Sequence, residues 1–452
     1  MASILEKIKG ASIVQKAVRS SALTLVNFGS GQIIRLAANL VLTRLLFPEA
    51  FGIMALASVT VIALNQFSDV GIIPSIIRSK RGEDPVFLDT AWTIKIIRSV
   101  ILWLVAYLIA QPLSVFYNEP LLAQIIPFLA VTTVIEGFLP TKIETALRNI
   151  QHGRMTVLDI TSNLFSVTSM IIMAWQLNSL WALPIGTVIG SFGKLVLYQF
   201  FMPGRRNGFA LEKAAALELM HFGKWIFPAT IATFLIIEAD KFLIGRYSSL
   251  ETLGIYNIGF FLASFPLIIA RMLGGRVMVS YFKSASEEQS ESTAKKTRKL
   301  MFLLFGGLSM AIIPLVLLGQ WIVEFLYDDR YIAAGLILVT LTSMNILQIA
   351  QIPYQNAQLA LGRGKDYFIL LACKAFFVIV CIWIGLENFG LLGAILGQGA
   401  AMVLSYPIVV YFARKLEVFD PLYDLVLYTI AATAIGIAWW LYAERISELI
   451  VY

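Results

Sequence analysis

Basic side chains lie deep inside the long apolar segments of this 452-residue chain. Six of them are furthest from the segment ends: Arg35, Lys95, Arg98, Lys194, Arg271 and Lys374. Two more, Lys241 and Arg276, lie nearer to segment ends, from where a long side chain can reach an interface. A charge near the centre of a membrane helix costs about 3 kcal/mol. Acidic residues at similar depth are too few to neutralise six cations, so the pattern predicts a cavity for an anion such as phosphate.

Amide side chains accompany these cations. Asn27, Gly31, Arg35 and Asn39 recur every four residues, on one side of a helix. Stripes of this kind can simply hold helices together, but beside surplus cations they favour a wet, amide-lined cavity. Amides donate and accept hydrogen bonds, which suits sugar hydroxyls. The amides predicted to contact a sugar are Asn27, Asn39, Asn163, Asn345, Gln348 and Gln355.

Carboxylates at membrane depth are the candidates for carrying H⁺ or Na⁺. They are Asp69, Glu136, Glu238 and Asp240, with Asp159 nearer to a segment end. The sequence does not choose among them. Glu238 and Lys241 are three residues apart and are predicted to pair on one helix.

The composition indicates that lipid surrounds most of the chain. Hydrophobic residues make up 58% and charged residues 14%, where a soluble protein has about 25% charged residues. Windows of about 20 apolar residues predict membrane-spanning helices. We predict thirteen spans, at 21–44, 51–77, 88–110, 121–147, 154–177, 179–202, 220–245, 253–280, 300–320, 332–361, 366–386, 390–413 and 424–442.

The distribution of Lys and Arg predicts the orientation. With a cytoplasmic N-terminus, nearly all loop cations fall in inside loops, and the outside loops hold only Arg44, Arg246, Arg330 and Arg445. Residues 1–20 lack a clear cleavage site after a short apolar core, so they are not a convincing signal peptide. They are predicted to form a basic amphipathic helix on the cytoplasmic face.

A short pattern occurs twice. LTRLLFPEAFGI and IGRYSSLETLGI share R-x₄-E-x₂-G-I, and Arg246 follows Arg44 by 202 residues, as Gly254 follows Gly52. Each copy joins the first two spans of a run of six. A proline shortly before Ala-Leu, in spans four and ten, repeats in the same way. Because six is even, the two halves enter the membrane in the same direction, as a parallel repeat.

The predicted fold class is an all-α polytopic membrane protein with two pseudo-symmetric six-helix lobes and an extra C-terminal helix. The predicted divisions are the amphipathic helix 1–20, an N-lobe at 21–202, a cytoplasmic linker at 203–219, a C-lobe at 220–415, and the extra segment with the C-terminus at 416–452.

LTRLLFPEAFGIMALA, then QFSDVGI and an R-S-K loop, resembles the start of Wzx-type polysaccharide flippases. These form the PST branch of the multidrug/oligosaccharidyl-lipid/polysaccharide (MOP) exporter superfamily. EADKFLIGRYSSLETLGIYNIG resembles the seventh-to-eighth helix region of that family, with D-[KR]-x-x-I-G followed by L-G-x-Y. The resemblance extends to about residue 415. A lone thirteenth span departs from the even numbers usual in the family.

The resemblance implies a MATE-like fold whose lobes enclose a cationic cavity. It implies alternating-access flipping of undecaprenyl-pyrophosphate-linked oligosaccharide units across a bacterial inner membrane, for O-antigen, exopolysaccharide or capsule synthesis. The partners it implies are that lipid-linked oligosaccharide, the bilayer, a polysaccharide polymerase and a chain-length regulator. No nucleic-acid partner is expected, because the basic excess of +7 suits cytoplasmic loops.

Two other functions remain open. A cation-coupled multidrug exporter of the same superfamily would favour an acidic, aromatic cavity. A membrane-embedded polysaccharide polymerase or ligase would need a large outside loop with catalytic residues, and no predicted loop is long enough. We expect no enzyme activity, no ATP hydrolysis, since a phosphate-binding loop motif is missing, and no cofactor. With only His152, His221, Cys373 and Cys381, we expect no metal site either.

Overall fold

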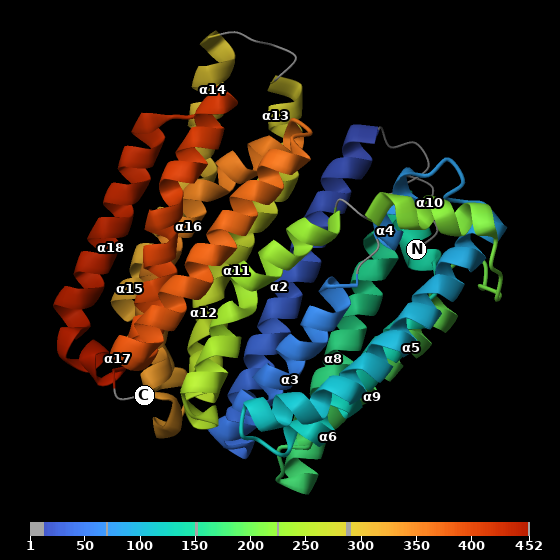
Figure 1. The fold of residues 1–452 in the computed structure, drawn as a ribbon, viewed down its shortest axis with the longest axis horizontal. Helices are drawn as coiled ribbons and strands as arrows, with labels where there is room; N and C mark the ends of the chain where they lie inside the picture. The colour runs from blue at the N-terminus through green and yellow to red at the C-terminus, as the bar shows by residue number, and fades with distance from the viewer. Residues whose placement is uncertain (1–12, 69–70, 150–151, 224–225, 286–290, 451–452) are drawn as a thin grey trace. The chain divides into compact units, whose positions relative to one another are not determined.

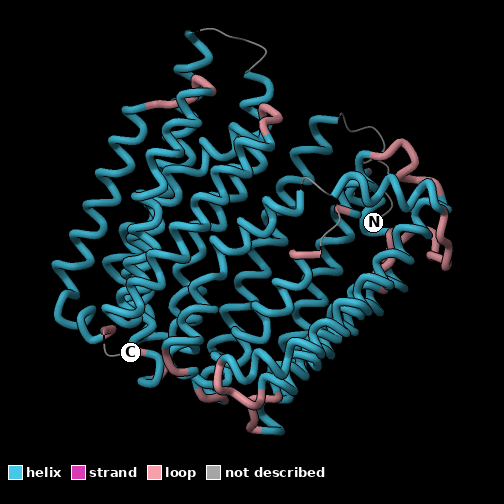
Figure 2. Tube along the Cα trace, viewed as in Figure 1, coloured by secondary structure: helices cyan, strands magenta, loops and turns pink. Residues whose placement is uncertain are grey.

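The computed structural model describes residues 13–68, 71–149, 152–223, 226–285 and 291–450. Within these ranges every regular element is a helix (Figures 1 and 2). The chain divides into two compact units. Unit 1 comprises Met1–Leu46 and Thr60–Phe227, and unit 2 comprises Phe47–Val59 and Pro228–Tyr452. The predicted all-helical membrane fold is confirmed at this level.

Unit 1 is built on long apolar helices that pack in pairs: α2 on α8, α8 on α9, and α5 on α6. Its helices, with the later part of α3, are α2 (Ile13–Leu45), α3 (Pro48–Gln66), α4 (Ile72–Arg78), α5 (Pro85–Phe116), α6 (Leu122–Gly137), α7 (Lys142–Arg148), α8 (His152–Leu177), α9 (Ala182–Phe201) and α10 (Lys213–Gly223).

Two of the spans predicted in this half are each broken into two helices. The segment 51–77 divides into α3 and α4, and Gly71 at the start of α4 has a left-handed backbone (φ 70°) that glycine adopts without strain. The segment 121–147 divides into α6 and α7, which are bent by 62°. The prediction of a separate helix at 1–20 is wrong from Ile13 onward, because residues 13–20 continue into α2; residues 1–12 lie outside the described part.

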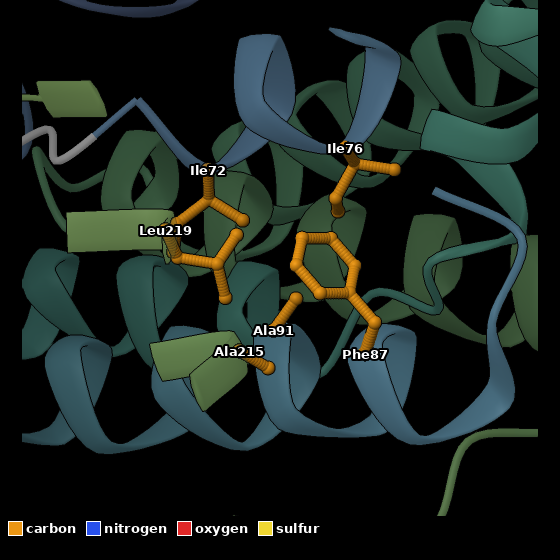
Figure 3. Packing of buried hydrophobic residues seen from close by; sticks show 6 residues of the cluster. All are labelled: Ile72, Ile76, Phe87, Ala91, Ala215 and Leu219. Carbon is orange, nitrogen blue, oxygen red and sulfur yellow. The ribbon is translucent and has the colours of Figure 1, made fainter. Parts of the chain in front are cut away.

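The predicted linker at 203–219 is bound tightly to unit 1. The buried carboxylate of Asp89 on α5 accepts hydrogen bonds from Arg205 Nη2 at 2.7 Å, from the backbone N–H of Gly208 at 3.0 Å and from Asn207 Nδ2 at 3.3 Å. Beyond it, α10 adds two apolar side chains to a cluster that joins three helices (Figure 3). The cluster consists of Ile72, Ile76, Phe87, Ala91, Ala215 and Leu219. This segment is therefore a structural part of unit 1.

Unit 2 is organised around α16, which contacts α12, α15, α17 and α18 and is mostly buried. Figure 1 shows α15, α16 and α18 as neighbouring long helices. The elements of unit 2, with the first part of α3, are α11 (Ile226–Tyr247), α12 (Leu250–Leu273), the π-helix η1 (Gly274–Met278), α13 (Val279–Ala285), α14 (Glu291–Met301), the π-helix η2 (Phe302–Gly306), α15 (Gly307–Leu326), the 3₁₀-helix η3 (Asp329–Tyr331), α16 (Ala333–Ala360), α17 (Gly364–Lys415) and α18 (Pro421–Glu448).

The 52-residue α17 contains two helices joined at a kink. Phe389 and Gly390 have non-helical backbone angles there, and Gly390 has φ 56°. The kink falls between the predicted spans 366–386 and 390–413. Eight helices in the described ranges are long and apolar enough to cross a membrane, or nine with the bent pair α6–α7. The number of thirteen spans therefore stays a prediction.

The repeated sequence pattern marks a close helix crossing inside unit 2. A Cβ atom on Gly52 would lie 2.0 Å from the carbonyl oxygen of Leu250, and one on Gly254 would lie 1.9 Å from that of Pro48. Leu250 follows Pro48 by the same 202 residues that separate the glycines. The first turns of α3 and α12 therefore meet reciprocally, at a distance that only glycine permits.

Candidate functional site

Two of the six predicted cations lie together in unit 2. Lys374 on α17 is only 1% exposed, and Arg271 on α12 is partly buried. Their positive charges act on each other, and the carboxylate of Glu238 acts on Arg271. Within the described ranges, neither cation has an ion-pair or hydrogen-bond partner. Two neighbouring cations, one of them fully buried, form a site that favours an anion.

The packing of α12 determines where Arg271 lies. The helix passes into the π-helix η1 at Gly274, one turn after Arg271. A Cβ on Gly274 would lie 2.4 Å from Asn356 Nδ2 and 2.5 Å from Ile352 Cγ2, so this turn is pressed against α16. Single-turn π-helices are frequent at functional sites. The close contact therefore holds Arg271 at a fixed height beside α16.

The carboxylates of α11 have local partners. Lys241 Nζ lies 2.5 Å from Glu238 Oε2, which confirms the predicted pair. Asp240 accepts hydrogen bonds from Tyr256 of α12 and from Gln398 Nε2 of α17, the latter at 3.1 Å. Asp240 and Tyr256 belong to the two motifs that carry the sequence resemblance. In this structure those motifs join α11, α12 and α17.

Lys95 in unit 1 has an acidic partner that the sequence reasoning did not count. Its Nζ lies 2.8 Å from Glu144 Oε1 of α7 and 3.3 Å from the carbonyl of Leu139. Both side chains of the ion pair are mostly buried. Glu144 lies near the end of the predicted span 121–147. Because Lys142 is assigned to the cytoplasmic loop that follows this span, Glu144 is not counted among the carboxylates at membrane depth. The Lys95 charge is therefore balanced within unit 1.

Arg98 is engaged at the C-terminal end of α3. Its Nη2 donates to the carbonyl of Asn65 at 2.5 Å and to Ser68 Oγ at 2.8 Å. The last carbonyls of a helix lack intrahelical partners and carry partial negative charge, so a cation is favourable there. Arg98 can thus stabilise α3 without any ligand.

The other two of the six predicted cations, Arg35 and Lys194, also lie in unit 1. Arg35 on α2 is exposed and interacts with other residues of the chain. Lys194 on α9 is partly exposed and has no ion-pair or hydrogen-bond partner in the described part of the chain. Arg35 and Lys194 are therefore the unit 1 cations best able to meet an anion.

The amides predicted in unit 1 lie on α2 and α8. Asn27 Nδ2 donates to Asp159 Oδ2 at 2.9 Å, and Tyr198 of α9 donates to Asp159 Oδ1 at 2.5 Å. This network ties three helices together and uses Asn27 structurally. Asn163 is exposed, close to Gly31, and Asn39 is partly exposed.

The amides of α16 separate onto two helix faces. Asn345, Gln348 and Gln355 share a partly exposed face, where Asn345 donates to the carbonyl of Ala263 at 2.9 Å. Gln351 and Gln358 lie on the adjacent, fully buried side of the same helix. The three predicted sugar contacts on α16 thus share one accessible face.

Two of the predicted ion-carrying residues are in unit 1. Asp69 lies outside the described residues. Glu136 is exposed near the end of α6, and its carboxylate has no hydrogen-bond partner within the described ranges. No group of three or more His, Cys, Asp or Glu side chains that could hold a metal ion occurs among the described residues.

A further polar cluster, absent from the predicted sites, centres on Asp424 at the beginning of α18. Tyr354 of α16 and Tyr406 of α17 donate to its two carboxylate oxygens, at 2.8 and 2.7 Å. Asp424 opens the predicted span 424–442, and a carboxylate at a helix start has the appearance of an ordinary cap. Gln351, Tyr354 and Gln358 recur along α16 at helical spacing, and this polar stripe was the sequence signal for the cluster.

Mutating the Lys95–Glu144 pair tests its structural role. We expect Lys95→Met and Glu144→Gln to destabilise unit 1 by about 3 kcal/mol each, because each leaves a buried charge unpaired. The double variant should recover much of this loss. Thermal unfolding of the purified protein in detergent measures all three. Additive losses would show that the pair contributes no coupling energy.

Comparison with known proteins identifies the family. The family described as "Polysaccharide biosynthesis protein" matches residues 41–334. The teichuronic acid biosynthesis protein TuaB of Bacillus subtilis is 23% identical over 285 residues, 62% of this chain and 58% of TuaB. The lipopolysaccharide biosynthesis protein WzxC of Escherichia coli is 21% identical over 375 residues, 81% of this chain and 75% of WzxC. The match to TuaB thus spans less than two thirds of that relative.

Solved structures show the same fold. The lipid II flippase MurJ, in an inward closed conformation, superposes with a TM-score of 0.69 and 13% identity, over 96% of this chain and 97% of MurJ. An inward-facing multidrug resistance MATE transporter of the MOP superfamily gives 0.64 and 12%, over 86% and 94%. This chain therefore belongs to the family described as "Polysaccharide biosynthesis protein" and shares the fold of these solved structures.

Proposed function

We propose that this transporter flips an undecaprenyl-pyrophosphate-linked oligosaccharide across a bacterial inner membrane by alternating access of its two halves. The observation that carries the proposal is the unbalanced pair Arg271 and Lys374 in unit 2. A pyrophosphate brings the negative charge that this pair lacks. Arg271 can bind two phosphate oxygens at once, and Lys374 supplies a compact charge.

The remaining predicted residues have graded roles in this proposal. Arg35 and Lys194 are the unit 1 cations that contact the substrate, while Lys95 and Arg98 chiefly support the helices. Asn345, Gln348 and Gln355 contact the sugar from their shared face of α16. The N-terminus is cytoplasmic, in keeping with the distribution of basic residues.

The names of similar proteins support the proposed flipping of a lipid-linked sugar. WzxC and TuaB are named for lipopolysaccharide and teichuronic acid biosynthesis, and MurJ is named a lipid II flippase. The cation pair disfavours a multidrug exporter of cationic compounds, because it would repel them. A polysaccharide polymerase and a chain-length regulator remain the proposed partners.

Reconstitution tests the function. Proteoliposomes that contain the full chain and a fluorescent undecaprenyl-pyrophosphate oligosaccharide should show time-dependent protection of the sugar from a membrane-impermeant quencher. Empty liposomes and liposomes with undecaprenyl monophosphate alone are the controls. Transport of a cationic dye with no movement of the lipid-linked sugar would overturn the proposal in favour of drug export.

A further inference from the structure

Asp424 is a carboxylate buried at the start of α18. It lies in the first turn of α18 and is 4% exposed. Within the described ranges no Lys or Arg forms an ion pair with it. A buried ionised carboxylate is costly unless it is paired or well hydrogen-bonded, and a group of this kind readily takes up a proton instead.

The groups that face Asp424 come from three helices. From α18 and its N-cap these are Tyr423, Tyr428 and Asp420. From α16 there is Tyr354, and from α17 there is Tyr406, whose hydroxyl also feels the charge of Arg414. Arg298 of α14 is bonded to Asp420. Arg298 is therefore already neutralised by another carboxylate, and the hydrogen bonds that Asp424 accepts come from tyrosine hydroxyl groups.

The hydroxyl of Tyr354 can serve both protonation states of Asp424. It lies 2.8 Å from Asp424 Oδ1 and 3.4 Å from the carbonyl oxygen of Asp420. When Asp424 is ionised, Tyr354 and Tyr406 both donate to it. When Asp424 gains a proton, its new O–H can donate to the Tyr354 oxygen, and the Tyr354 proton turns to the Asp420 carbonyl. The added proton thus leaves no donor or acceptor unmatched.

A second, independent feature is a pair of buried glutamines on α16, next to Tyr354. Gln351 and Gln358 flank Tyr354 on the buried face of α16, and both are 0% exposed. Neither amide atom of Gln358 has a partner in the described chain, nor does Gln351 Oε1. Gln351 Nε2 donates to Tyr428 OH at 3.1 Å, and the Tyr428 ring lies 4.8 Å from that of Tyr406.

These amides extend the polar contacts into a continuous seam between α16, α17 and α18. Buried amide atoms that lack protein partners are where water molecules bind inside proteins. Water bound along the seam would connect Asp424 to the end of α18, where Arg298, bonded to the buried Asp420, is partly exposed. The seam therefore offers a route along which a proton can reach the carboxylate.

We propose that Asp424 is a proton-binding site of the transporter, that Tyr354 and Tyr406 are its positioning residues, and that the extra helix α18 supplies the carboxylate for proton coupling. The reaction is a simple exchange: one proton from water joins Asp424 Oδ1, and the Tyr354 hydroxyl changes acceptor. The site is distinct from Glu136, Glu238 and Asp240. The proposal of a proton site at Asp424 does not depend on which anionic lipid the transporter carries.

The test uses the purified full-length protein in detergent, with the proton itself as the ligand. Infrared difference spectra recorded across pH detect the carbonyl stretch of protonated carboxylic acids. We expect Asp424→Asn to remove one carboxyl component of this band. Asp366→Asn is the matched control, because Asp366 on α17 is paired at the surface with Lys415 at 2.9 Å. A titration of Asp424→Asn that overlays the wild type would overturn the proposal.

Tyr354→Phe provides a second test that keeps the carboxylate, and it applies even where Asp424→Asn does not accumulate. It removes a donor to the ionised form, so the midpoint of the Asp424 component should move to higher pH, by about tenfold in proton affinity. Tyr406→Phe should act in the same direction. A purely structural role predicts lower thermal stability with an unmoved midpoint, and that result would overturn the proposal that the two tyrosines position the proton at this site.

Discussion

Glutamine at Lys374 should strongly slow the proposed flipping while leaving the protein folded, with greater thermal stability than the wild type. Lys374 is buried and has no anionic partner in the described chain, so its charge destabilises the empty protein. The same charge is needed when a pyrophosphate is bound. We expect the flipping rate to fall about 100-fold, since a hydrogen bond between charged groups contributes about 3 kcal/mol.

Arg271 allows a graded version of this experiment. Arg271→Lys keeps the charge but loses the two-pronged geometry, so partial flipping should remain, whereas Arg271→Gln should behave like Lys374→Gln. Lys241→Gln is the matched control in the same unit, because Lys241 is paired with Glu238. That variant should lose stability.

The readouts are flipping in proteoliposomes and thermal unfolding in detergent. Normal flipping by the double variant Arg271→Gln/Lys374→Gln would mean that these cations are structural. The substrate assignment would then rest on family membership alone.

The helices were largely predictable because apolar runs of about 20 residues have few alternatives in lipid. Each predicted span coincides with helix, and the errors are at breaks. The left-handed Gly71 divides α3 from α4, and a bend divides α6 from α7. A glycine or proline in an apolar run has several outcomes, and the tertiary packing selects among them.

The pairing of charges was less accessible. Lys95 and Glu144 are 49 residues apart and meet only through the tertiary arrangement of unit 1. The position of a residue along a membrane helix can be predicted from the sequence. The rotation of the helix about its own axis, which decides which neighbours the residue meets, cannot.

The amides of α16 show the same limit. Positions 348, 351, 355 and 358 follow one helical period and read as a single stripe. In the structure Gln351 and Gln358 are buried, whereas Gln348 and Gln355 are partly exposed.

Alanine at Gly52 or at Gly254 will destabilise the protein strongly. The added Cβ would lie about 2 Å from a backbone carbonyl oxygen, of Leu250 in the first case and of Pro48 in the second. A carbonyl inside a helix cannot rotate away, so the helices must separate. Overpacking of this kind costs about 1–3 kcal/mol, and valine should cost more than alanine.

Gly436 on α18 is the matched control, because a Cβ there meets nothing within 4 Å. Gly436→Ala should stabilise the protein by up to about 1 kcal/mol through helix propensity alone. Gly52→Ala should lower Tm and Gly436→Ala should raise it. Because both are helical glycines in long apolar segments, opposite signs would distinguish the effect of close packing from that of helix propensity.

The reciprocity of the crossing makes a sharper prediction. Gly52 meets Leu250 and Gly254 meets Pro48, with the same 202-residue offset in each pair, so the two single alanine variants should lose similar amounts of stability. In the double variant one separation of α3 from α12 relieves both clashes, so its loss should be clearly less than the sum of the singles. Thermal unfolding of the four proteins in one detergent decides this. Fully additive losses would show that the two copies of the repeated pattern do not act as one contact.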